Sequence, residues 1–267
     1  MTNNSSTPQS TGTRPAGIAF YTFPGLAFVH IPAGRFLMGS KKENPLADDD
    51  EKPQHIVDIP YDYWMARFLI TNSQYAEYIL AKGASHPVND WQEKKNHPVV
   101  HVSWKEAMAY CGWHNGLLKA ELPAGYILRL PTEAEWEKAA RGTDGLEWPW
   151  GNEFEKNRCN SGESREGGPT PIGLYSPQGN SPYYCADMGG NVWEYTHSQF
   201  RSYPYQANDG REVEEKSSVE VLRGGSWNND RNKTRCAFRC NFNKGLQYYY
   251  CGFRMVVVPL ISEISKH

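Results

Sequence analysis

Two stretches near the C-terminal end, Val221–Trp227 (VLRGGSW) and Gly252–Val258 (GFRMVVV), decide the predicted fold. Each is typical of a β-strand, because Val, Leu and Trp flank a glycine pair in the first, and Phe, Met and three Val fill the second. Between them lies a different kind of sequence, residues 228–251, NNDRNKTRCAFRCNFNKGLQYYYC. Neither a two-residue nor a 3.6-residue hydrophobic period organises this segment, which includes five Asn, three Cys and three consecutive Tyr. The pattern predicts a stiff frame that carries a polar and aromatic binding surface.

The composition favours one loop-rich α+β domain. The chain has 267 residues, enough to bury a sizeable core, and its 24 Gly and 18 Pro supply many turns. The formal net charge of −2 gives no basic face for nucleic acid. No apolar run approaches the roughly 18 residues that a membrane-spanning helix needs. We therefore expect no nucleic-acid partner and no membrane span.

The first 26 residues are predicted to be a disordered leader, followed by a single domain over residues 27–267. The sequence MTNNSSTPQSTGTRPAG at the start is polar and lacks the apolar core of a secretory signal. Without such a signal the cytoplasm is the default compartment, and the six cysteines are expected to be mainly reduced thiols.

Helix-start signals mark three helices. Thr71 precedes the sequence NSQYAEYILAK, which ends at Gly83. Ser103 and Glu106 have the spacing of a capping box, and Thr132 opens the sequence EAEWEKAARG. These local signals predict helices that start next to each capping residue.

Turn-forming residues predict a hairpin in one further stretch and a long loop in another. Residues 28–39 show a strand, a Pro/Gly turn and a second strand, which predicts a hairpin. Residues 153–184 are rich in Gly, Pro, Asn and Ser, and so long a loop in a compact domain is usually functional or held by a ligand or ion. Cys111 lies on the apolar face of the second helix and is expected to be a core thiol rather than a nucleophile.

Seven motifs carry a resemblance to a known family: FVHIPAGRFLMGS, HPVVHVSW, LRLPTEAEWEKAARG, PWGN, DMGGNVWEY, VLRGGSW and GFR. In this order they resemble the formylglycine-generating enzyme, or sulfatase-modifying factor, family, and they cover nearly the whole chain after the leader. The resemblance implies a C-type-lectin-like fold of the α+β class with few regular elements. It also implies that a C-terminal segment forms the ligand-facing surface. Because the family contains several functions, the fold alone does not decide the activity.

The copper site of the catalytic family members is expected to be broken here. Those enzymes carry two cysteines five residues apart after the GGS motif, and paired thiolates suit a soft ion such as Cu(I). Cys236 stands at the second position, whereas the first is Arg231, whose guanidinium cannot replace a thiolate. The iron-binding helical partner domain of the ergothioneine-pathway relatives also has no place in the short leader.

A third branch of the family fits the segment better. The segment resembles the variable region of proteins diversified by retroelements, in which adenines of the copied template are randomised. Asn codons are adenine-rich, so their variants become residues whose codons end in a pyrimidine, while the RGGSW and GFR brackets are left unvaried. On this resemblance we predict thirteen ligand-binding positions: Asn228, Asn229, Asp230, Asn232, Phe238, Cys240, Asn241, Phe242, Asn243, Tyr248, Tyr249, Tyr250 and Cys251.

The chemistry of these positions suits adaptable recognition. Tyr offers a large amphipathic contact area with few torsions to freeze, and Asn forms adaptable hydrogen bonds, as in antibody paratopes. Phe238, Phe242 and Tyr248 to Tyr250 are the expected aromatic anchors. The alternative is a loop whose tyrosines pack on their own domain. Exposed Cys240 and Cys251 would be a liability on an ordinary surface, which favours diversification, although a disulfide between them stays open.

The neighbouring framework side chains are expected to be structural. Arg223, Arg239 and Arg254 are predicted to pair internally with carboxylates rather than with a ligand. Trp227 is expected to lie in the core, with the floor of the binding site as the alternative.

The DMGGNVWEY turn carries a metal hypothesis that rests on the resemblance. In formylglycine-generating enzymes the matching stretch binds calcium through hard oxygen ligands. Carried over, Asp187 and Glu194 would supply carboxylates, and Met188, Gly190 and Val192 would supply carbonyl oxygens. No cofactor is required, and a calcium ion here would be structural. The alternative is a turn in which Glu194 pairs with an arginine.

The sequence therefore predicts a non-enzymatic, receptor-type protein diversified by a retroelement of a bacterium or phage. Its partner would be an unidentified protein or surface ligand bound by residues 228–251, and display on a phage or cell surface stays open. The alternative is a copper-dependent formylglycine-generating oxidase or another enzyme of the family. A structural module of a larger complex is a weaker third reading.

Overall fold

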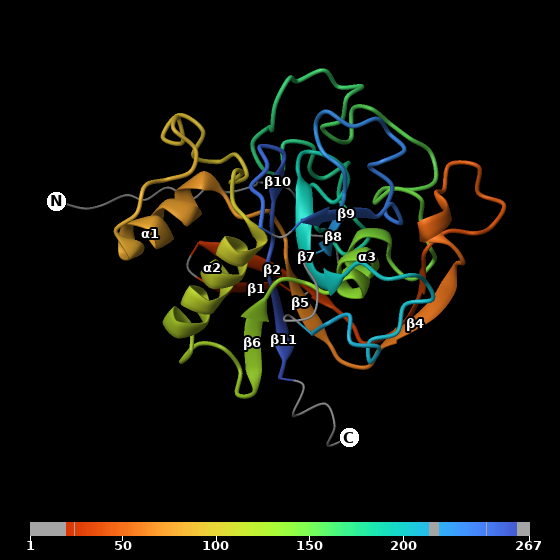
Figure 1. Cartoon of the computed structure of the whole chain (residues 1–267), viewed down its shortest axis with the longest axis horizontal. Helices are drawn as coiled ribbons and strands as arrows, with labels where there is room; N and C mark the ends of the chain where they lie inside the picture. The colour runs from red at the N-terminus through yellow and green to blue at the C-terminus, as the bar shows by residue number, and fades with distance from the viewer. Residues whose placement is uncertain (1–19, 24, 214–218, 244, 261–267) are drawn as a thin grey trace.

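The computed structural model describes residues 20–23, 25–213, 219–243 and 245–260. Three α-helices stand among these residues, α1 (Asn72–Lys82), α2 (Trp104–Leu117) and α3 (Glu133–Arg141), together with the short 3-10 helix η1 (Asp49–Glu51) (Figure 1). No helix of this part of the chain combines the length and apolar character that crossing a membrane requires.

The first sheet has five strands, in the spatial order β1 (Phe20–Phe23), β2 (Leu26–Ile31), β5 (Tyr63–Ala66), β11 (Val256–Pro259) and β6 (Tyr126–Arg129). Every neighbouring pair in this sheet is antiparallel. The bracket sequence GFRMVVV supplies β11, whose valines are buried because Val256 and Val258 pack in one core cluster and Val257 packs in the other.

The second sheet includes strands from the segment 228–251. Its order is β10 (Cys251–Gly252), β7 (Trp193–Gln199), β8 (Val219–Arg223) and β9 (Cys240–Asn243). β10 and β7 are parallel, whereas the other pairs are antiparallel. The strands β3 (Gly34–Met38) and β4 (His55–Ile59) form a separate pair. The segment thus leaves β8, contributes β9 and ends in β10 of the same sheet, after which the chain enters β11 of the first sheet (Figure 1).

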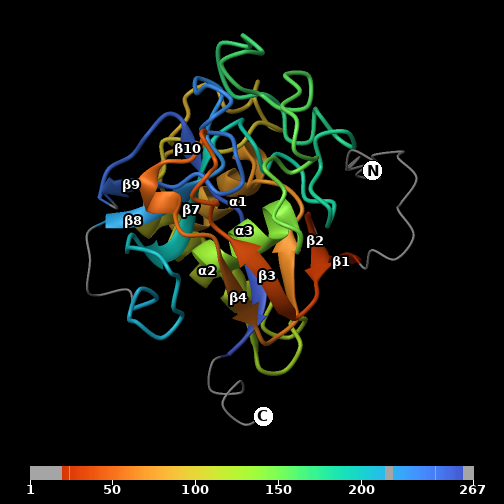
Figure 2. The same cartoon turned by 90° about the vertical axis from the view of Figure 1, so that its right-hand side faces the viewer.

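Helix α3 is the centre of the molecule. It contacts β3 and β4 on one side and β7 and β8 on the other, as the turned view shows (Figure 2). All nine of its residues are buried, among them Glu133, Glu137 and Arg141. Buried charges are costly unless they are paired, so this helix needs partners of opposite charge from the surrounding elements.

The predicted helix ends are confirmed. The side chains of Thr71, Ser103 and Thr132 each accept a hydrogen bond from a backbone N–H in the first turn, and all three form capping boxes. Gly83 ends α1 in the left-handed conformation at φ +64. Cys111 is buried in the apolar core, as expected for a structural thiol.

Two predictions of organisation are wrong. The strands predicted to form a hairpin within residues 28–39 belong to different sheets, because β2 pairs with β1 and β5, while β3 pairs with β4. The predicted leader of residues 1–26 contains strand β1, which pairs with β2, so its last part is ordered. Residues 1–19 of that leader lie outside the described residues.

The core also contains an isolated histidine, which gives a prediction of acid sensitivity. His114 is 8% exposed, packs on the rings of Tyr110 and Trp113, and has no hydrogen-bond partner at either ring nitrogen among the described residues. Burial lowers its pKa from 6.5 to about 4. The unfolded chain therefore takes up a proton below pH 6.5 that the folded chain refuses, and stability falls as the pH drops towards 4.

We expect this effect to cost about 3 kcal/mol of unfolding free energy at pH 4. Urea unfolding at pH 7.5 and pH 4.5 should show a smaller acid-induced loss for His114→Leu than for the wild type. The matched control is His101→Asn, an exposed histidine at a left-handed position that Asn tolerates. An acid-induced loss that is equal in wild type and His114→Leu would contradict the prediction.

Candidate ligand-binding surface

The turn after β8 fixes the direction in which the segment leaves the sheet. Gly224 and Gly225 have φ values of +89 and +69, which glycine adopts without strain. A Cβ atom at Gly225 would lie 2.6 Å from the carbonyl oxygen of Lys233. The glycine pair of the GGS motif is therefore required by backbone conformation and by the close approach of the segment itself.

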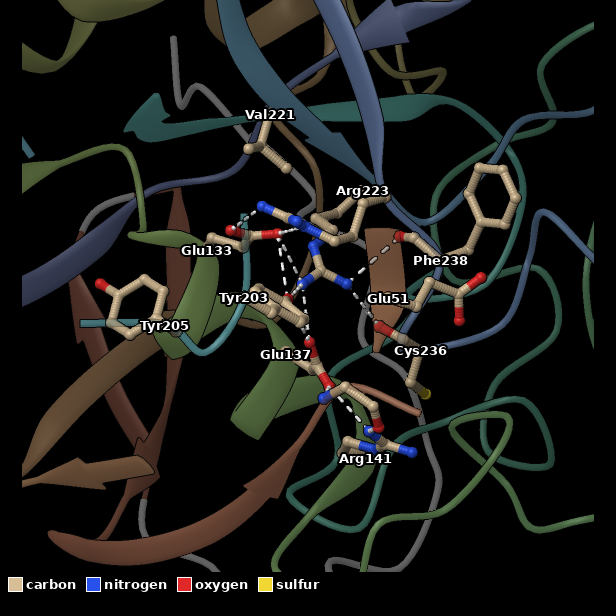
Figure 3. A network of polar contacts seen from close by, with 12 residues as sticks. Glu51, Glu133, Glu137, Arg141, Tyr203, Tyr205, Val221, Arg223, Cys236 and Phe238 are labelled. Carbon is tan, nitrogen blue, oxygen red and sulfur yellow. Dashed lines mark hydrogen bonds and ion pairs between the residues drawn. The ribbon is translucent and has the colours of Figure 1, made fainter. Parts of the chain in front are cut away.

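Buried arginines hold the segment from below. Arg223 donates from Nη2 to Glu133 (2.8 Å) and to Glu137 (2.6 Å), as Figure 3 shows in part. Its Nη1 donates to the carbonyl oxygens of Cys236 (2.9 Å) and Phe238 (3.2 Å). One guanidinium thus connects helix α3 to the backbone of the segment (Figure 3).

Two further arginines come from within the segment. Arg235 donates from Nη2 to Glu51 at 2.6 Å, and Arg239 donates from Nε to Glu133 at 2.5 Å. Burial alone would raise the pKa of Glu133, but Arg239 and Arg223 hold this pKa below its usual range. The internal pairing predicted for Arg223 and Arg239 is confirmed, and the same holds for Arg254 with Glu194.

Most of the thirteen predicted ligand-binding residues reach the surface. Three are buried, which leaves ten whose side chains are exposed or half-buried. We call these ten the outward set: Asn228, Asn229, Asp230, Asn232, Cys240, Asn241, Asn243, Tyr248, Tyr249 and Tyr250. Residues of other types between them, such as Thr234, Arg235 and Ala237, are buried. The segment therefore has a buried central block, residues 234–239, with exposed or half-buried stretches on both sides of it.

Phe238, Phe242 and Cys251 require a correction. Their side chains are 9%, 6% and 0% exposed and belong to the main core cluster, so they have almost no surface to offer a ligand. The ring of Phe242 packs on Tyr195, with the ring centroids 4.8 Å apart. Two of the expected aromatic anchors thus belong to the core, because they lie on the inner side of the segment.

The three consecutive tyrosines divide between surface and core. Tyr249 is 49% exposed, whereas Tyr248 and Tyr250 are half-buried and pack against the core cluster. Trp227 is half-buried rather than core, and its ring lies 6.2 Å from that of Tyr249. Trp227 and Tyr249 therefore bring the two ends of the segment together on one side of the molecule.

Five exposed positions among the described residues of the segment were not predicted. They are Arg231, Lys233, Gly245, Leu246 and Gln247, and Leu246 is 52% exposed. The prediction followed residue type: Lys and Gln codons end in a purine, and Arg, Gly and Leu were not among the residue types chosen. Their place between outward residues in an irregular segment was the signal that could have found them.

The copper site of the catalytic relatives does not fit this chain. Cys236 is fully buried, and burial raises the pKa of its thiol far above the usual range, which disfavours the thiolate that binds metal. Arg231 at the position of the other cysteine is exposed and supplies no sulfur. All six cysteines are unpaired thiols in the structure, and Cys240 is half-buried on β9.

One of the two carboxylates expected to bind calcium, that of Glu194, is already paired with an arginine. Both oxygens of Glu194 accept hydrogen bonds from Arg254, at 2.6 and 2.8 Å, so Glu194 does not fit a ligand role in this arrangement. Asp187 accepts from the backbone N–H of Gly173 at 2.7 Å, and burial raises its pKa to about 6. No cluster of three or more His, Cys, Asp or Glu suited to a metal occurs among the described residues. Ligation by Asp187 and the carbonyl oxygens of Met188, Gly190 and Val192 stays a prediction.

The geometry can now be compared with known proteins. A family model described as the sulfatase-modifying factor enzyme 1-like domain matches residues 21–258. The chain belongs to this family. Its relatives in the sulfatase-modifying factor family include the mouse "Inactive C-alpha-formylglycine-generating enzyme 2", 33% identical over 257 aligned positions that cover 75% of this chain and 74% of the relative. The "Formylglycine-generating enzyme" of Thermomonospora curvata is 29% identical over 300 positions, covering 87% and 93%.

Two solved structures share the fold. "PvdO from Pseudomonas aeruginosa" superimposes with a TM-score of 0.75 at 22% identity and covers 92% of this chain and 99% of its own. The "Treponema denticola variable protein 1" gives a TM-score of 0.70 at 22% identity, covering 91% and 99%. These likenesses confirm the predicted C-type-lectin-like fold, with few helices and many loops. By their names, the relatives include both enzymes and an inactive member, so family membership alone does not decide catalysis.

Proposed function

We propose that the chain is a non-enzymatic ligand-binding protein whose outward set varies through a diversity-generating retroelement. One observation carries this proposal. Within residues 228–251, the Asn and Asp side chains and Tyr249 are exposed or half-buried and Tyr248 and Tyr250 are half-buried, while the arginines that hold the segment are buried. A protein whose surface is rewritten must keep its fold when those side chains change. This division of the segment supplies that tolerance.

The site chemistry supports recognition of a macromolecule. Asn and Tyr side chains give adaptable hydrogen bonds and aromatic area on a rigid base. The buried block of residues 234–239 and the strand β9 anchor the segment, so binding would freeze few backbone torsions there. A solved variable protein with the same fold is consistent with this use, although the likeness concerns the fold alone.

The proposal predicts that two display libraries behave differently. The first randomises the outward set, and the second randomises Phe238, Phe242 and Cys251. Most members of the first should keep melting temperatures within about 5 °C of the parent, because their side chains touch solvent. Most members of the second should lose roughly 3 kcal/mol or more through cavities and overpacking. Selection on an immobilised test protein should then yield binders from the first library only.

Two results would contradict the proposal. Equal loss of folding in both libraries would mean that the outward residues belong to the packing of the domain. Conversion of a cysteine-containing sulfatase peptide by the purified chain with copper, abolished in Cys236→Ser, would favour the oxidase. The DNA around the gene supplies an independent check, since a reverse transcriptase and a second copy of the 3′ end differing at adenines are expected there.

A further inference from the structure

A cavity of about 400 Å³ opens beside Tyr249, at the edge of the outward set. Apart from Tyr249, its walls come from residues outside 228–251: from the start of α1, from residues 88–101 and from residues 166–169. His101 links it to the segment, because its backbone N–H donates to the carbonyl oxygen of Tyr248 at 3.0 Å. His101 holds this position at φ +58, in the left-handed region that non-glycine residues rarely adopt. The cavity is therefore part of the frame.

Two polar atoms of the cavity walls are buried and have no hydrogen-bond partner among the described residues. They are Oδ1 of Asn72 and Nδ1 of His97. Asn72 is 2% exposed, and its Nδ2 donates to the carbonyl oxygen of Lys94 at 2.9 Å, which fixes Oδ1 as the unpartnered acceptor. Burial lowers the pKa of His97, so its ring is neutral near pH 7. A buried acceptor without a donor is destabilising, and a ligand that donates a hydrogen bond to it would remove that penalty.

The charge of the cavity is negative. Asp90 pairs with Lys94 at 2.7 Å, so these two lining residues neutralise each other. Glu166 also lines the cavity, is exposed, and forms no ion pair with another residue of the described ranges. Tyr249, which is 49% exposed, also lines the cavity, and the face of its aromatic ring attracts a cation. The carboxylate of Glu166, the unpartnered amide oxygen of Asn72 and the aromatic face of Tyr249 together favour a positively charged hydrogen-bond donor.

We infer that this cavity binds a basic side chain, lysine or arginine, of the partner protein. The inference deepens the proposed function and rests on it for the identity of the partner. Because all the lining residues except Tyr249 lie outside the diversified segment, every variant of the outward set would keep Glu166 and the polar walls of the pocket, and only the aromatic wall at position 249 would change. The partners of different variants would then share an exposed basic residue that docks next to the changing surface.

The test uses arginine amide and citrulline amide as probes, which share the α-amino group and differ in that the ureido side chain of citrulline is uncharged. In ¹H–¹⁵N correlation spectra of the full chain, arginine amide should shift the backbone amides of Gly167, Gly168 and Tyr249 along saturating curves. Citrulline amide should bind roughly tenfold more weakly, since it lacks the charge. Glu166→Gln should weaken arginine amide binding roughly threefold, because the site is open to solvent. Glu93→Gln is the matched control. Glu93 is an exposed carboxylate within residues 88–101, the stretch that forms another wall of the cavity, but its own side chain does not line the cavity.

Absence of shifts at these amides, or equal shifts with both probes, would overturn the inference. Equal effects of Glu166→Gln and Glu93→Gln would also overturn it, since they would indicate a general response to charge. The titration needs no partner protein, so its outcome is separate from that of the libraries. Binders selected from the outward library together with a silent titration would leave the proposed function standing and remove the pocket.

Discussion

Replacing Arg223 by leucine is expected to lower the free energy of unfolding by about 3–5 kcal/mol. The guanidinium is fully buried and pairs with Glu133 and Glu137, whose side chains are also fully buried (Figure 3). Leucine would leave the charge of two carboxylates in the core less compensated, with Arg239 and Arg141 as their remaining cations. The two segment carbonyls that Arg223 binds would lose their donor as well.

Urea unfolding at pH 7.5 measures this change. The matched control is Arg35→Leu, because Arg35 and Asp58 form an exposed pair at 3.8 Å. That substitution should cost less than about 1 kcal/mol, as exposed ion pairs usually do. A similar cost for both variants would contradict the view that the buried network holds the segment in place.

Gly190→Ala is expected to destabilise the chain by more than about 3 kcal/mol, or to prevent folding. Gly190 lies at φ +84, and an added Cβ would approach the carbonyl oxygen of Asn160 to 2.2 Å. The backbone N–H of Gly190 donates to Gly224 at 2.7 Å, so the turn cannot move away without breaking its link to the GGS motif. Strain and overlap therefore act together.

The control separates these two causes. Gly83 has a similar positive φ of +64, but an added Cβ there would meet nothing within 4 Å. Gly83→Ala should cost only about 1 kcal/mol, which is the conformational part. Thermal unfolding of both variants shows the difference, and equal melting temperatures would mean that the close approach at Gly190 relaxes at little cost.

Features set by neighbouring residues were predictable from the sequence. The caps at Thr71, Ser103 and Thr132 depend on a side chain and an amide three residues later, so a short window contains the whole interaction. The partners of β2 and β3 depend on strands distant in the chain, and the adjacent turn residues suggested a hairpin that does not exist. Sheet membership is not local information.

The candidate surface was predictable in part for the same reason. The polar and aromatic composition of residues 228–251 located the surface, but the composition is silent on which side of an irregular segment each aromatic side chain takes. Phe242 faces inward because its neighbours in β9 alternate about the sheet, and Tyr249 faces outward in a turn. The walls of the cavity beside Tyr249 come from three stretches that are far apart in the sequence, so no single stretch could predict it.

The position of β9 has a consequence for colloidal behaviour. Within the described residues β9 pairs with β8 alone, which leaves its other edge free for a second molecule to add a strand. Asn241 and Asn243 on this strand belong to the outward set, so variants with apolar side chains there would invite self-association. β9 has only four residues, too short for the six- or seven-residue segments that build cross-β fibrils. The short edge would thus limit fibril formation even where apolar substitutions at Asn241 and Asn243 promote self-association.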